Sequence, residues 1–101
     1  MNVLLVDDHA ILLDGMKSLL TSMDGYNVVG TATTVEAALN SFEQLQPDLV
    51  ISDYSLPDGN GAQLAKQLRF QSDEVKIMVL SMHSEVHIVN CLLYTSDAAD
   101  D

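Results

Sequence analysis

The sequence predicts an α/β fold in which a parallel sheet is covered by helices on both faces. Short apolar runs alternate along the chain with longer stretches whose apolar residues recur at helical spacing. Units of this kind form right-handed crossovers between parallel strands. At 101 residues the chain has room for one domain and one core, and its 48% apolar content argues against disorder.

Four apolar runs are the expected strands, because continuous apolar runs are typical of strands buried on both faces. They are residues 3–6, 28–31, 49–52 and 75–80. The second run is the weakest, since Gly30 interrupts it. The third leads directly to Asp53 and then to a segment rich in Pro, Gly, Asn and Asp, which continues neither a strand nor a helix.

Helices are expected between the strands. The first spans residues 9–23 and stops at Asp24-Gly25; its apolar positions are Ile11, Leu12, Gly15, Met16, Leu19, Leu20 and Met23. Thr33 and Glu36 have the spacing of a capping box, so the second helix begins there, and Pro47 ends it. The third covers residues 61–70, and a fourth starts at His83.

Three of the expected strands end in polar residues: Asp7-Asp8, Asp53 and Ser81. In a parallel sheet these ends lie along one edge, so the side chains converge there. Carboxylates that meet repel each other unless a cation joins them, and Mg²⁺ with its oxygen ligands is the natural partner. Ser81 has two interpretations: an N-cap for the next helix, or a hydrogen-bond donor to a phosphoryl oxygen.

A carboxylate beside Mg²⁺ can attack phosphorus and form an aspartyl phosphate, which makes Asp53 the candidate nucleophile. The chain lacks a Gly-rich ATP loop, so a phosphorylated protein is the expected donor. A phosphohydrolase with an aspartyl nucleophile is the alternative, although such enzymes place a second Asp where this chain has Ser55. A flavin-binding protein is a further alternative, but Asp7-Asp8 would repel its phosphate.

The formal net charge of −11 disfavours direct nucleic-acid binding, because Lys17, Lys66, Arg69 and Lys76 are the only fixed cations. A single cysteine, Cys91, fits a reducing cytoplasmic setting. The sequence shows neither a signal peptide nor an apolar run approaching the ~20 residues of a membrane span.

The motifs resemble the receiver domain of two-component response regulators. They are Val6-Asp7-Asp8-His9, Asp53 with Ser55-Leu56-Pro57-Asp58-Gly59-Asn60-Gly61, and Val79-Leu80-Ser81-Met82. The details are most similar to the subfamily with a C-terminal LuxR-type helix-turn-helix domain. The resemblance implies a flavodoxin-like, doubly wound sheet of order 2-1-3-4-5. It also implies a non-enzymatic phosphoacceptor, a sensor histidine kinase as partner, and DNA contact only through a C-terminal domain absent here. A phosphorylation-dependent homodimer of the full-length protein is a further implication.

The same resemblance assigns the site residues. Asp53 would accept the phosphoryl group, and Asp8, Asp53 and the Ser55 backbone carbonyl would bind Mg²⁺, with Asp7 acting through water. Ser81 would be the switch hydroxyl.

The resemblance extends over residues 1–90, which we expect to be an incomplete receiver domain. The fifth strand, its terminal lysine and the fifth helix of the family are not found in the sequence, and no lysine follows Ser81. Residues 91–101 resemble the translation of a sequencing adapter, so we expect this tail to be non-native. Without the fifth strand and the lysine, we expect this chain to be marginally stable or to aggregate, and to be phosphorylated poorly if at all.

Overall fold

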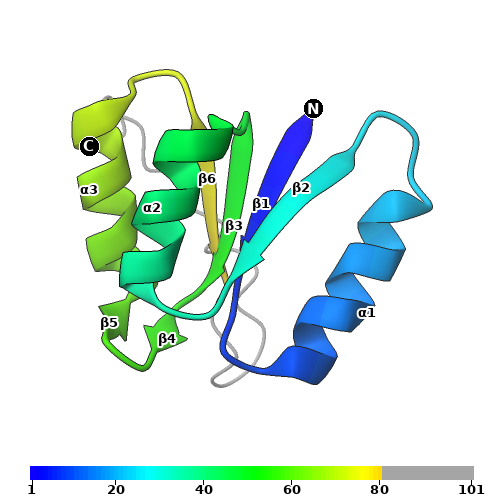
Figure 1. The fold of residues 1–101 in the computed structure, drawn as a ribbon, viewed down its shortest axis with the longest axis horizontal. Helices are drawn as coiled ribbons and strands as arrows, with labels where there is room; N and C mark the ends of the chain where they lie inside the picture. Colours follow the sequence, from blue (N-terminus) through cyan, green and yellow to red (C-terminus); the bar gives the residue numbers. More distant parts are fainter. Residues whose placement is uncertain (81–101) are drawn as a thin grey trace.

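The computed structural model describes residues 1–80, which form a four-stranded parallel sheet with helices on both faces (Figure 1). The strands are β1 (Asn2–Val6), β2 (Asn27–Ala32), β3 (Leu49–Asp53) and β6 (Lys76–Leu80). Their order is β2-β1-β3-β6, and each neighbouring pair is parallel. The predicted parallel sheet and its order are therefore confirmed for the described strands. The predicted helix from His83 lies outside the described residues.

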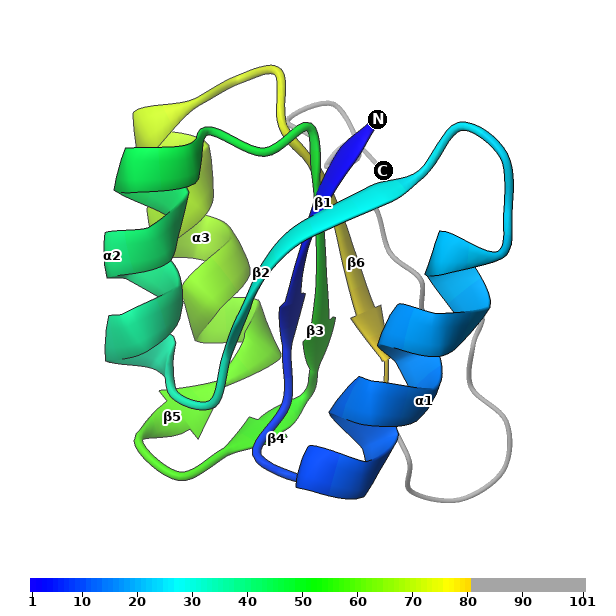
Figure 2. The same ribbon diagram turned by 45° about the vertical axis from the view of Figure 1, so that its right-hand side comes forward.

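Three helices connect the strands and cover the sheet unequally. They are α1 (Ala10–Thr21), α2 (Val35–Leu45) and α3 (Gly61–Gln71). Among the described helices, α1 is the one that covers one face, whereas α2 and α3 lie side by side on the other (Figures 1 and 2). None of the described helices is long and apolar enough to cross a membrane.

Each face of the sheet has its own apolar layer. The larger layer joins the sheet to α2 and α3, and its central side chains include Leu4, Val50, Ile77, Phe42, Leu64 and Leu68. The smaller layer lies under α1 and contains Val3, Leu5, Leu13, Leu49 and Ile51. Successive residues of β1 and β3 alternate between the two layers because strand side chains point to opposite faces. The central strands are therefore held from both sides.

The inward face predicted for the first helix was wrong in part. Ile11 and Leu19, assigned to the apolar face, are 85% and 62% exposed. The one buried residue of α1 is Leu13, and the partly buried Met16 and Leu20 pack against the same layer. These three positions are three and four residues apart, which defines a narrower stripe than the apolar pattern suggested. Helix α1 has more apolar residues than it buries, and its packing against the sheet determines which of them face the core.

A short antiparallel pair that the sequence did not predict follows β3. It consists of β4 (Ser55–Leu56) and β5 (Gly59–Asn60), and it links the carboxyl end of β3 to α3. Asn60 then caps α3: its Oδ1 accepts from the Gln63 backbone N–H at 2.8 Å, and the Gln63 side chain accepts from the Asn60 N–H at 3.1 Å. The segment after Asp53 is thus an ordered hairpin with a capping box at its end.

The start of the second helix also differs from prediction. The N-cap is Thr34, whose Oγ1 accepts from the Ala37 N–H at 3.0 Å, so the capping box assigned to Thr33 and Glu36 is wrong. The Glu36 N–H donates instead to Asp58, a residue of the β4–β5 turn. Local spacing misplaced the cap by one residue because a distant side chain satisfies part of this helix end.

Candidate functional site

Two buried carboxylates lie at the carboxyl ends of adjacent central strands. Asp53 is the last residue of β3, and Asp7 directly follows β1. Strands β1 and β3 pair up to Val6 and Ser52, which brings the next residue of each strand to the same edge. Asp7 is 5% exposed and Asp53 is 6% exposed. The sheet therefore removes both carboxylates from most of their water while leaving them at its end.

Backbone hydrogen bonds fix both positions beyond the regular strands. The Asp7 N–H donates to the Ala32 carbonyl at 3.0 Å, and the Tyr54 N–H donates to the Leu80 carbonyl at 2.7 Å. Asp53 itself is in register with Leu80 of β6. The chain on both sides of the candidate nucleophile is thus anchored to the neighbouring strand.

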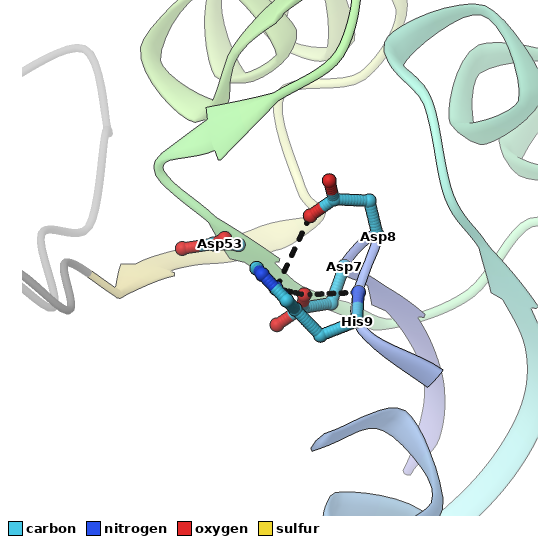
Figure 3. A group of neighbouring side chains, drawn as sticks. All are labelled: Asp7, Asp8, His9 and Asp53. Carbon is cyan, nitrogen blue, oxygen red and sulfur yellow. Dashed lines mark hydrogen bonds and ion pairs between the residues drawn. The ribbon is translucent and has the colours of Figure 1, made fainter. Parts of the chain in front are cut away.

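Asp8 and His9 complete a group of four side chains with the two buried carboxylates (Figure 3). One candidate ligand atom from each of Asp7, Asp8, His9 and Asp53 lies within 4.8 Å of the others. Asp8 is exposed, so the group is open to solvent on one side. Ser55 is also exposed and lies two residues after Asp53, at the start of β4. Ser81, the predicted switch hydroxyl, lies outside the described residues.

His9 received no role from the sequence, yet it contacts both neighbouring carboxylates. Its Nδ1 lies 2.9 Å from Asp7 Oδ1 and 3.2 Å from Asp8 Oδ1. The His9 backbone N–H also donates to Asp7 Oδ1 at 2.9 Å. The hydrogen bond to Asp7, followed by the charge of Asp8, raises the pKa of His9 above its ordinary value. The available signal was its place directly after an acidic pair.

The pKa of Asp53 is raised above its ordinary value, foremost by burial and then by the charge of Asp7. The backbone N–H groups of Tyr54 and Ser55 oppose this rise by favouring the ionised form. Burial and a nearby like charge both disfavour a carboxylate, and a cation placed among the carboxylates reverses the second effect. The electrostatics of the group thus favour a bound cation.

The donor set fits a hard divalent cation. Asp7, Asp8 and Asp53 offer carboxylate oxygens, which Mg²⁺ prefers, and the exposed side at Asp8 leaves room for the waters that this ion keeps.

Magnesium is expected to lower the pKa of His9. In metal-free buffer the imidazole should titrate above the ordinary value of 6.5, because Asp7 and Asp8 favour its charged form. An ion bound by the same carboxylates competes for that negative charge, so the midpoint should move toward lower pH. NMR titration of the imidazole carbon-bound protons, with His9→Gln to assign the signal, measures both midpoints. Equal midpoints with and without Mg²⁺ would show that the ion does not bind these carboxylates.

Comparison with known proteins shows which family the chain belongs to. The family model described as the response regulator receiver domain matches residues 3–100. The chain belongs to the response regulator receiver domain family. The family match disfavours the phosphohydrolase alternative and confirms the resemblance seen in the motifs around Asp7, Asp53 and Val79.

Two curated relatives show how much of a longer protein the chain represents. It is 34% identical over 96 residues to the nitrate/nitrite response regulator protein NarL of Escherichia coli K12, covering 94% of this chain and 44% of NarL. It is 31% identical over 87 residues to the transcriptional regulatory protein YdfI of Bacillus subtilis, covering 86% of this chain and 40% of YdfI. The chain therefore spans less than half the length of these relatives.

Solved structures agree with the fold and the subfamily. A LuxR-family two-component response regulator from Aurantimonas is 30% identical, with a TM-score of 0.78, over 82% of this chain and 59% of that chain. RcsB from Salmonella enterica bound to promoter DNA is 34% identical, with a TM-score of 0.75, over 82% of this chain and 42% of that chain. The sheet order and the LuxR-type likeness expected from the sequence are both confirmed.

Proposed function

We propose that this chain accepts a phosphoryl group on Asp53, with Asp7, Asp8 and the Ser55 carbonyl helping to hold Mg²⁺. The observation that supports this proposal most strongly is the placement of Asp53: a buried carboxylate at the end of β3, with Asp7 and Asp8 within 4.8 Å. Such a site suits phosphoryl transfer, which depends mainly on positioning and on charge stabilisation.

In the proposed reaction an Asp53 carboxylate oxygen attacks the phosphorus of a phosphohistidine. The new O–P bond forms as the N–P bond breaks, and the released imidazole takes up a proton. Mg²⁺, when bound, supplies positive charge to the oxygens of the transferring group. The strand pairing at Leu80 holds the Asp53 backbone still during attack, and burial limits the access of competing water.

Ser81 remains the proposed switch hydroxyl. It lies outside the described residues, but its neighbour Leu80 is in register with Asp53. This register supports the proposal, because a chain that continues from Leu80 begins at the phosphoacceptor's edge. The predicted domain limit at residue 90 and the non-native tail likewise lie outside the described residues and stay predictions.

The partners follow from the same proposal. The donor is a sensor histidine kinase, and the full-length protein is a transcription regulator that contacts DNA through a further domain. The names of NarL and YdfI, and the DNA-bound RcsB structure, support this for the relatives. We also propose phosphorylation-dependent dimers of the full-length protein, a cytoplasmic location beside the kinase, and no enzymatic turnover beyond phosphoryl uptake and loss.

A small phosphodonor such as acetyl phosphate tests the proposal without the kinase. With Mg²⁺, prolonged incubation should yield a slowly formed, acid-stable and base-labile phosphate, because an acyl phosphate is hydrolysed readily by hydroxide. Borohydride reduction followed by peptide mass spectrometry should place the modification at Asp53. EDTA should prevent it. A label on another residue, or one that forms equally well in EDTA, would contradict the assignment.

A further inference from the structure

Asp58 joins two parts of the chain that are distant in sequence. It lies in the turn between β4 and β5, and its Oδ1 accepts from the Val35 N–H at 2.7 Å. Its Oδ2 accepts from the Glu36 N–H at 3.1 Å. Val35 and Glu36 are the first two residues of α2. One carboxylate thus bridges the hairpin after Asp53 to the first turn of α2.

This contact is electrostatically well matched. The first N–H groups of a helix have no partner within the helix, and the helix dipole places positive charge there. The Val35 N–H is the main cause that lowers the pKa of Asp58, and the Glu36 N–H adds to it while burial opposes it. Asp58 therefore stays ionised, and both of its oxygens remain acceptors at neutral pH.

The hairpin that Asp58 holds starts at the candidate site. Its first part is anchored by Tyr54, whose N–H donates to the Leu80 carbonyl at 2.7 Å and whose carbonyl accepts from the Gly61 N–H at 2.6 Å. In the middle, Leu56 is buried in the larger apolar layer. At its tip, Asp58 is held by α2. The backbone at Ser55 is thus held in place by contacts of its neighbours with three other elements: β6, α3 and α2.

We propose that Asp58 is a positioning residue for the candidate metal centre: by tying the β4–β5 turn to the first turn of α2, it fixes the backbone at Ser55. The inference rests on the proposed function, in which the Ser55 carbonyl is a metal ligand. Asp58 does not touch the metal in this role. It acts through the hairpin, in the way that outer groups orient metal ligands.

The chain offers a matched control for this proposal. Thr34 also caps α2, but its Oγ1 accepts from the Ala37 N–H of the same helix and not from the hairpin. Thr34→Ala and Asp58→Ala both remove hydrogen bonds from the first turn of α2, and only Asp58→Ala also releases the turn. A difference between the two variants therefore reports on the hairpin, beyond the general loss of helix capping.

The experiment is a Mg²⁺ titration of the chain and its variants, followed by the backbone amide signals of residues 54–60 in NMR spectra. Asp58→Ala should weaken Mg²⁺ binding about tenfold, at the lower end of the range for outer-shell partners of a metal. Both alanine variants should lower the unfolding midpoint, because each removes a cap of α2. Thr34→Ala should nevertheless keep the wild-type dissociation constant for Mg²⁺. Asp58→Asn, which retains one acceptor oxygen, should fall between Asp58→Ala and wild type.

Two outcomes would overturn the proposal, and they are distinguishable. If all variants bind Mg²⁺ as tightly as wild type, Asp58 is a helix cap only, and the proposed function stands. If wild type itself shows no Mg²⁺-dependent shifts, both the metal centre and its positioning residue are wrong. If Asp58→Ala fails to fold, the Mg²⁺ dissociation constant of Asp58→Asn tests the proposal instead. A value equal to that of wild type would contradict it.

Discussion

Asp53→Asn is expected to abolish phosphorylation and, in metal-free buffer, to raise the stability of the fold. The first effect follows because the amide is not a nucleophile toward phosphorus. The second follows because burial and the charge of Asp7 disfavour the ionised Asp53 side chain. The candidate ligand atoms of this cluster lie within 4.8 Å of one another, and like charges at about this separation repel by about 1–4 kcal/mol, depending on the local dielectric constant.

The gain in stability should depend on pH in a defined direction. A carboxyl group whose pKa is raised by folding favours the folded state when protonated, and that contribution is lost as the pH rises through the folded pKa. Wild type and Asp53→Asn should therefore have similar midpoints below the ordinary Asp pKa of 3.8 and diverge above it. Thermal unfolding at several pH values, in EDTA, measures this difference.

Asp14→Asn is the matched control for the charge itself. Asp14 is an exposed carboxylate on α1, so its replacement changes the net charge by the same amount without touching the cluster. Mg²⁺ should stabilise wild type and Asp14→Asn by about 2.7 kcal/mol at a hundred times the dissociation constant, and Asp53→Asn much less. If Asp14→Asn and Asp53→Asn are more stable than wild type by the same amount in EDTA, the lower net charge, and not the carboxylate cluster, causes the gain in stability.

Gly61→Ala is expected to destabilise the fold by about 1–3 kcal/mol, the usual cost of overpacking. A Cβ at this position would lie 2.8 Å from the Asp53 carbonyl oxygen and 2.9 Å from Val79 Cγ1. The first of these atoms is backbone in a central strand, so it has little freedom to move aside. Relief of the contact should also displace Asp53 and slow its phosphorylation. Denaturant unfolding and the phosphodonor assay measure the two effects.

Gly15→Ala separates this contact from the general effect of removing a glycine. Gly15 lies in α1, where an added Cβ would meet nothing within 4 Å. Alanine is favoured over glycine in a helix by about 1 kcal/mol, so this variant should be more stable than wild type. A Gly61→Ala variant as stable as wild type would show that the close approach to Asp53 is readily relaxed.

The sequence was sufficient to place the two buried carboxylates of the candidate site. Asp7 and Asp53 each follow an apolar run, and parallel strands bring their carboxyl ends to one edge whatever the details of the helices. The prediction rested on the spacing of apolar residues and on the direction of the strands, both of which can be inferred from short stretches of sequence. The same logic placed the four strands of the parallel sheet and the three described helices to within a few residues, but it missed β4 and β5.

What the sequence could not supply depends on contacts between distant segments. The rotation of α1, which buries Leu13 and exposes Ile11, is chosen by packing against the sheet. The bond from Asp58 to the start of α2 spans 22 and 23 residues, so no local spacing announces it. The contacts of His9 differ from these two, because its partners Asp7 and Asp8 are neighbours in sequence; they depend on how the chain turns after β1.

The adjacency of β1 and β3 has a consequence for the order of folding. Their pairing closes a loop that contains β2 and two helices, so it is a non-local contact with a large entropic cost of closure. Asp7 and Asp53 meet only after that loop has closed. Nascent chains and partly folded intermediates that lack the β1–β3 pairing therefore lack the candidate site as well. A cation that binds these carboxylates would bind only the completed topology, and by mass action it would stabilise that topology over partly folded states.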